Sequence, residues 1–340
     1  MYRVKNSLRN LTHFLLLSIV LVIVMAAGVG CQPPNPQPEP FAKPVPSAVV
    51  EIRDRPTELE LARDTQVVML GTGTPIPDAY RAGPSIAVIH KGEAYLFDIG
   101  AGSVANAATA RYKYDIPSLY PLQICCVFLT HLHSDHTDDL SELAFKLWWR
   151  RTRPLAVWGP VGLSEMAAGM YAMMAPDARL RASGTQPVKD TEAYKIEATE
   201  ITEGVVLQKD DLTIEAFLVS HGDIAPAFGY RITTAKKTIV ISGDTSYNEK
   251  VLEMARGADL LIHEVISDGG LVRTSADFQA YHRKAHTTAR DLGRLAIEAK
   301  PGKLILYHAL YYGVPEQQVL DEVRSVYNGE VILANDLDSF

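Results

Sequence analysis

The residue types best suited to chemistry are concentrated in residues 130–136, which have the sequence Thr-His-Leu-His-Ser-Asp-His. Alternate residues of an extended chain share a face, so His131 and His133 would point to the same side. A turn after them would aim Asp135 and His136 elsewhere, which lets four ligand-type side chains divide between two metal ions. Burying these groups together without a cation would be costly. The segment therefore predicts a metal site.

The donor types narrow the choice of metal. Imidazole and carboxylate suit zinc, and manganese and iron accept the same donors. We expect two zinc ions, with manganese or iron as the open alternatives. Because such ions lower the pKa of a bound water, the expected nucleophile is a metal-bound hydroxide and not a side chain.

The elements that must position this segment are strands. Apolar runs end at or just before further ligand-type residues, namely His221, Asp244, Glu264 and His308. Loops at strand ends are where rigid scaffolds present chemistry. The predicted strands cover residues 66–70, 85–90, 94–98, 124–130, 155–158, 212–220, 228–233, 238–242, 260–263, 303–307 and 331–334.

Helical patterns alternate with these strands. They cover residues 103–112, 138–150, 162–174, 249–256, 287–299 and 315–326. Short turns between some strands predict hairpins, and helices between others predict crossovers. The sequence thus predicts an α/β (α+β) fold with mixed sheets flanked by helices.

The N-terminus has the order of an export signal. Arg3, Lys5 and Arg9 precede an apolar run at 14–30, and small residues lead into Cys31. We predict a signal peptide at 1–30, and the small residue before Cys31 resembles the lipidation site of bacterial lipoproteins. An uncleaved membrane anchor is the alternative, because the run is at the short limit for a span. Both interpretations attach the chain to, or pass it through, a membrane and predict export to the periplasm.

Prolines at 33, 34, 36, 38, 40, 44 and 46 follow the signal. This density favours an extended polyproline conformation, so we predict a stiff linker over 31–60. The chain contains no second segment of this kind. We therefore predict one catalytic domain over 61–340.

Charge bears on the partners. The whole chain has a formal net charge of −7, and its first thirty residues hold three basic and no acidic side chains, which leaves −10 for the rest. An acidic domain disfavours a nucleic-acid partner. We therefore expect a small-molecule substrate.

Cys125 and Cys126 are adjacent in a predicted strand, where neighbouring side chains point to opposite faces. We expect two buried thiols without a function. With Cys31 assigned to processing, the cysteine content does not indicate a disulfide framework.

Residues 130–136 resemble the His-x-His-x-Asp-His signature of the metallo-β-lactamase superfamily. Further matches are 70–75 (Leu-Gly-Thr-Gly-Thr-Pro), 97–100 (Phe-Asp-Ile-Gly), 158–160 (Trp-Gly-Pro), 220–222 (Ser-His-Gly), 227–231 (Ala-Phe-Gly-Tyr-Arg), 242–245 (Ser-Gly-Asp-Thr), 263–264 (His-Glu) and 306–308 (Leu-Tyr-His). This order resembles the ribonuclease Z-like and arylsulfatase-like branch from about residue 66 to the end. The resemblance implies an αββα sandwich, and in this branch often a homodimer.

The resemblance also implies a ligand set for two zinc ions. One ion would take three histidines, His131, His133 and His221. The other would take Asp135, His136 and His308. Asp244 would bridge the two ions, so every ligand position of the family is filled.

Three residues receive catalytic roles in the same way. Asp135 would accept or orient the proton of the nucleophilic water. His286 would protonate the leaving group and Glu264 would orient His286. A plain helix-cap role for His286 is the alternative.

Two cations beside a developing oxyanion suit phosphodiesters, sulfate esters, lactones and thioesters alike, so likeness of fold leaves the substrate open. Long-armed ribonuclease Z enzymes insert an RNA-clamping arm where this chain has only a short hairpin between Arg231 and Gly243. Together with export and negative charge, this favours hydrolysis of small phosphate or sulfate esters. The alternatives are a ribonuclease Z-type endonuclease that processes tRNA 3′ ends, and a non-catalytic metal-binding surface lipoprotein.

Overall fold

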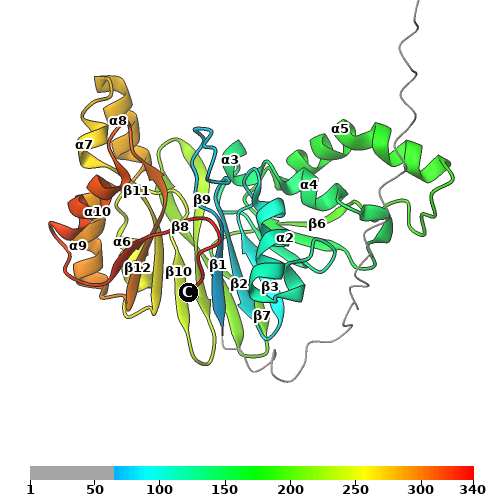
Figure 1. Ribbon diagram of the computed structural model, residues 1–340, viewed down its shortest axis with the longest axis horizontal. Helices are drawn as coiled ribbons and strands as arrows, with labels where there is room; N and C mark the ends of the chain where they lie inside the picture. The colour runs from blue at the N-terminus through cyan, green and yellow to red at the C-terminus, as the bar shows by residue number, and fades with distance from the viewer. Residues whose placement is uncertain (1–64) are drawn as a thin grey trace, which may run out of the picture. The chain divides into compact units, whose positions relative to one another are not determined.

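The computed structural model describes residues 65–340, which lie within one compact unit. Two β-sheets pack face to face in this unit, and helices cover their outer faces (Figure 1). The αββα sandwich expected from the sequence is therefore confirmed. The predicted signal peptide at 1–30, the linker at 31–60 and the domain start at 61 lie outside the described residues.

The first sheet has six strands. In spatial order they are β1 (Gln66–Gly71), β2 (Ser85–His90), β3 (Glu93–Phe97), β4 (Cys126–Phe128), β5 (Leu155–Gly159) and β6 (Ile196–Glu200). The first three strands pair antiparallel and β3 to β6 pair in parallel. The sheet is thus mixed, as hairpins followed by crossovers require.

The second sheet has seven strands. In spatial order they are β13 (Val331–Leu333), β12 (Lys303–Leu310), β11 (Leu260–Ile266), β10 (Thr238–Ile241), β9 (Ile224–Thr233), β8 (Leu212–His221) and β7 (Gly204–Lys209). Strands β10 to β13 pair in parallel, and β7 to β10 pair antiparallel. Strands β6 and β7 are not among the predicted ones. Their side chains are mostly half-buried or exposed, so the hydrophobic signal there is weak.

The core between the sheets is aromatic at its centre. The ring of Phe128 stacks on Trp158 at 4.7 Å and on Phe97 at 5.2 Å, and meets the edge of Tyr230 at 5.9 Å. The Tyr230 hydroxyl donates to the carbonyl of Leu129 at 2.7 Å. This core therefore holds the end of β4 immediately before residues 130–136.

Helices bury the outer face of each sheet. On the first sheet lie α2 (Ser103–Tyr114), α4 (Leu140–Phe145) and α5 (Leu163–Ser183). On the second sheet lie α6 (Glu249–Ala255), α9 (Ala289–Ala299) and α10 (Glu316–Arg324). Short helices fill the connections, namely η1 (Pro117–Leu119), α3 (Ser134–Thr137), η2 (Trp148–Arg150), α7 (Asp268–Leu271) and α8 (Ala276–Ala285).

Strand direction brings the chemistry to one edge of each sheet. Strands β8 and β10 both run antiparallel to β9, and β10 to β12 are parallel, so all four end at the same edge. Strands β3 and β4 likewise share a direction. Backbone hydrogen bonds join these edges across the sandwich, from Phe228 to Thr130 (2.9 Å) and from His308 to Thr72 (3.1 Å).

Two helix predictions are wrong in extent. The expected helix at 138–150 ends at Phe145, and Leu147 takes a left-handed φ of 54° before η2. The break lets the buried Trp148 donate to Asp177 at 3.1 Å and pack against Tyr194. Helix α5 continues past the predicted end at 174 to Ser183. In both places tertiary packing overrides the local pattern.

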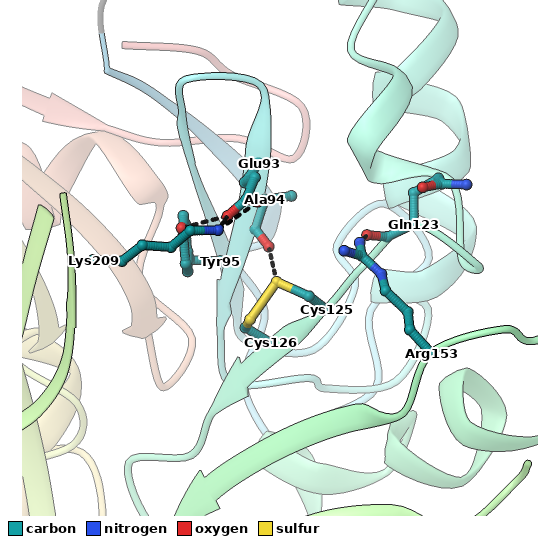
Figure 2. Close-up of a disulfide and its surroundings, with 8 residues drawn as sticks. All are labelled: Glu93, Ala94, Tyr95, Gln123, Cys125, Cys126, Arg153 and Lys209. Carbon is teal, nitrogen blue, oxygen red and sulfur yellow. Dashed lines mark hydrogen bonds and ion pairs between the residues drawn. A yellow bond between two sulfur atoms is a disulfide. The ribbon is translucent and has the colours of Figure 1, made fainter. Parts of the chain in front are cut away.

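The expectation of two free thiols is also wrong, because Cys125 and Cys126 form a disulfide (Figure 2). Strand β4 begins only at Cys126. Cys125 therefore precedes the paired ladder, and the alternation that would point the two side chains apart does not constrain it.

Among residues 65–340, no helix combines the length and apolar character needed to cross a bilayer.

Candidate metal centre

The strand ends bring all seven predicted ligands together. Three pairs of imidazole rings lie between 4.2 and 4.8 Å apart at their centres, namely His131–His136, His131–His133 and His131–His221. His308 lies 5.2 Å from His136. Residues that are far apart in sequence thus form one cluster, in which His133 and Asp135 are half-buried and the other five are buried.

The donor atoms fall into the predicted groups. His131, His133 and His221 offer ligand atoms within 4.8 Å of one another, and so do Asp135, His136 and His308. Asp244 groups with His131 and His136, and also with His221 and His286. The carboxylate of Asp244 therefore lies within reach of both sets, as a bridging ligand must.

Three histidines have one ring nitrogen occupied by a local partner. Nδ1 of His131 lies 2.9 Å from Oγ1 of Thr130, and Nδ1 of His221 lies 2.8 Å from the carbonyl oxygen of Ala285. Nδ1 of His136 lies 2.8 Å from Oδ2 of Asp98. Such partners orient the ring and direct Nε2 into the cluster, where Nε2 of His131 and Nε2 of His221 lie 3.0 Å and 3.3 Å from Nδ1 of His133.

Buried polar atoms without a hydrogen-bond partner indicate whether these residues suit a metal ion. Nε2 of His136 and Oδ1 of Asp244 are buried, and neither has a hydrogen-bond partner among residues 65–340. A buried acceptor without a partner costs free energy. A cation bound between the two groups would satisfy both, so the donor set fits.

The electrostatics also suit a cation. Burial lowers the pKa of His131, His133 and His221, which favours the neutral imidazole that binds metal. Burial would also lower the pKa of His136, but the carboxylates of Asp244 and Asp98 outweigh it and hold that pKa well above its usual value. The surroundings of His136 therefore favour positive charge.

Asp244 responds to the same neighbours. Burial would raise its pKa, but the charges of His308 and His136 hold it well below the ordinary value. Burial likewise opposes the charge on Asp135, and the hydrogen bond with His308 at 3.2 Å lowers its pKa overall. Both carboxylates are thus ready as anionic ligands.

Glycine allows the close approach of the Asp244 loop. Gly243 has a φ of 60°, and a Cβ atom there would lie 2.6 Å from the carbonyl oxygen of Phe228 and 3.0 Å from the side chain of Thr130. A larger residue would push Asp244 away from residues 130–136.

The three predicted catalytic residues also lie at the cluster. Nδ1 of His286 lies 3.3 Å from Oε2 of Glu264, and Oε1 of Glu264 accepts the backbone N–H of Thr287 at 2.7 Å. Asp135 and His286 both line the same cavity. Thr288 caps the start of α9 through its side chain, whereas His286 is the C-cap residue of α8, where its backbone N–H donates to the carbonyl of His282. A cap role for His286 therefore stands beside the catalytic one.

The cavity contains residues for which the sequence indicated no role. Its volume is about 340 Å³, and besides the cluster it is lined by Pro75, Ile76, Phe278, Tyr281, His282, Leu310 and Tyr312. Helix α8 supplies several of these, and it was missed because it is short and mostly exposed. Ser275, whose hydroxyl accepts the N–H of Phe278, and Asp277 in the first turn are the sequence signals for its start.

Comparison with known proteins agrees with this geometry. Residues 95–309 match the β-lactamase superfamily domain. Ribonuclease Z of Mycobacterium sp. (strain KMS) is 30% identical to the chain over 277 residues, which cover 80% of this chain and 94% of the relative.

Solved structures share the fold. The metallo-β-lactamase fold protein YhfI from Bacillus subtilis has a TM-score of 0.60 and 20% identity, covering 82% of this chain and 100% of that one. The short form of human tRNase Z has a TM-score of 0.58 and 22% identity, covering 81% and 98%. The chain therefore belongs to the metallo-β-lactamase superfamily and to its ribonuclease Z-like branch.

Proposed function

We propose that the protein is a two-metal hydrolase of phosphodiester bonds. The observation that carries the proposal is the pair of adjacent ligand groups with Asp244 in reach of both. Two zinc ions held there would polarise the phosphoryl oxygens and lower the pKa of water near them. Manganese or iron would suit the same donors.

The remaining roles belong to side chains of the cavity. Asp135 lines the cavity, and its lowered pKa keeps the side chain ionised, so the carboxylate can accept a hydrogen bond from the attacking water and orient it. Oε2 of Glu264 lies 3.3 Å from Nδ1 of His286 and so orients this ring, to which we assign protonation of the leaving group.

The relatives favour RNA as the substrate, whereas export, negative charge and the short hairpin predict small esters. A ribonuclease Z matches along 94% of its own length. The short hairpin between Arg231 and Gly243 does not by itself disfavour RNA. The connection between Thr233 and Thr238 has only four residues, which is too short for an arm. The alignment with the ribonuclease Z spans 277 residues and covers 80% of this chain, so it leaves little room for an inserted arm in that relative either.

Small phosphate or sulfate esters remain a second candidate because of the cavity. Among the described residues, those that line it include no lysine or arginine. Neutralising several phosphates normally takes such residues. The cavity therefore suits a substrate with a single phosphate or sulfate ester group better than one with several phosphates.

One set of assays tests the proposal. The full chain, loaded with zinc or manganese, would be given a precursor tRNA with a 3′ trailer, bis(4-nitrophenyl) phosphate and 4-nitrophenyl sulfate. We expect phosphodiester turnover that Asp244→Asn lowers by more than about a hundredfold, while the exposed Asp321→Asn leaves it unchanged. Cleavage of the tRNA alone would select the first candidate, and cleavage of small esters alone would select the second. Metal-loaded protein that hydrolyses no phosphodiester would overturn the proposal.

We also propose export and attachment through Cys31. Export would separate the enzyme from precursor tRNA, so location bears on the choice of substrate. Labelling of cells with a fatty acid should mark the wild-type chain and not Cys31→Ser. Fractionation that recovers the unprocessed chain from the cytoplasm would contradict export.

A further inference from the structure

Four residues with aromatic rings line the cavity beside the metal cluster, and none of them is a predicted ligand or catalytic group. They are Phe278, Tyr281, His282 and Tyr312, here called the aromatic wall. The first three belong to α8, and Tyr312 follows β12. The wall therefore comes from two segments that meet only in the folded chain.

His282 is the centre of the wall. Its ring lies 5.8 Å from Phe278, 5.0 Å from Tyr281 and 5.0 Å from Tyr312. A hydrogen bond of 2.6 Å joins Nε2 of His282 to the hydroxyl oxygen of Tyr312. These contacts fix the buried ring and give the wall a defined shape.

The wall begins close to the predicted ligands. The ring of His286 lies 5.4 Å from His282 on one side and 5.2 Å from the ligand His221 on the other. A group bound against the wall would therefore lie next to a phosphoryl group bound at the candidate metal cluster.

The outer part of the wall is exposed although it is apolar. Phe278 is 55% exposed and Tyr281 is 46% exposed, and Ile76 of the loop after β1 is 56% exposed at the same cavity. Large apolar side chains gathered at a cavity mark a binding surface. The inner part is neutral, because burial lowers the pKa of His282 to about 4.

We infer that the aromatic wall binds a planar, uncharged ring that the substrate carries next to its reacting phosphoryl group. The inference rests on the proposed function and makes Phe278 and Tyr281 determinants of specificity. Rings stack on aromatic side chains in offset or edge-on arrangements. An aryl ester and a nucleobase offer the same planar face, so the wall would accept a ring from either source.

Two matched pairs of probes separate the ring from the phosphoryl group. Phenylphosphonate and methylphosphonate differ by an aryl ring, and uridine 5′-monophosphate and ribose 5-phosphate differ by a nucleobase. Binding of each to the zinc-loaded full chain would be measured by calorimetry. We expect the ring-bearing member of at least one pair to bind about tenfold more tightly, and the pair that shows it identifies the source.

Substitutions in the aromatic wall test whether it causes the tighter binding of the ring-bearing probes. The double change Phe278→Ala and Tyr281→Ala should reduce the preference to less than about twofold, with binding of methylphosphonate unchanged. Phe278→Trp should keep it. Tyr112→Ala on α2 is the matched control, since Tyr112 is 69% exposed and lies outside the cavity.

The outcomes are distinguishable. Equal binding within both pairs, or a preference that survives the double change, would overturn the inference while the proposed function stands. The same holds if the double change alters the oligomeric state, because a second copy would then cover the wall. Failure of methylphosphonate itself to bind the metal-loaded chain would overturn the proposed function and the ring site with it.

Discussion

Oδ2 of Asp98 lies 2.8 Å from Nδ1 of His136, and both side chains are buried. Oδ1 of the same carboxylate accepts the backbone N–H of Thr130 at 2.8 Å. Asp98 thus connects the end of β3 to the end of β4 and aims Nε2 of His136 at Asp244. The carboxylate of Asp98 therefore orients a predicted ligand without itself belonging to the candidate ligand groups.

Replacing Asp98 tests this orientation. Asp98→Asn keeps the size of the side chain but removes its charge and one acceptor, so the His136 ring loses its fixed direction. We expect the affinity for zinc to fall by about 10- to 100-fold, measured by competition with a chelating dye. The exposed Asp321→Asn is the control. Unchanged affinity in Asp98→Asn would show that the contact does not orient the ligand.

His136 and His286 should differ in what their loss removes. His136→Ala deletes a predicted ligand, so metal content and activity should both fall. His286→Ala should lower activity less and leave the metal content intact. Metal analysis beside initial rates on one phosphodiester gives the comparison, and equal losses of activity at unchanged metal content would contradict the ranking.

Removal of metal should destabilise the fold. The cluster gathers buried groups that a cation satisfies, and a ligand present at one hundred times its Kd stabilises the folded state by about 2.7 kcal/mol. We expect EDTA to lower Tm by several degrees and zinc to restore it. The double variant His131→Ala and His133→Ala should show no such response. An identical Tm with and without metal in the wild type would rule out a bound ion at this cluster.

Tyr230 should contribute to stability through one hydroxyl. Tyr230→Phe leaves the carbonyl of Leu129 without the donor that now lies 2.7 Å away in the buried core. An unpaired buried acceptor costs about 1–3 kcal/mol, so we expect a loss in that range in urea unfolding. Tyr80→Phe, at a side chain that is 90% exposed, should cost nothing measurable. A stability loss equal to the control would mean that the bond contributes nothing.

The sequence by itself determined the types of the ligands and their places at strand ends. His131 and His133 alternate at the end of an apolar run, and Asp244 and His308 follow other runs, because strand periodicity is a local property. The same periodicity, with hairpins and crossovers, predicted the mixed sheets and outer helices. Local patterns are enough for features that depend on neighbours in sequence.

Tertiary structure decided what depends on contacts between distant residues. Only packing shows that Ala285 occupies Nδ1 of His221, that Tyr312 meets His282, and that the chain breaks after Phe145 to bury Trp148. Residue types carry no record of such pairings, because each depends on two segments that come together only when the sheets stack. The candidate metal cluster was therefore predictable from the sequence, and the aromatic wall beside it was not.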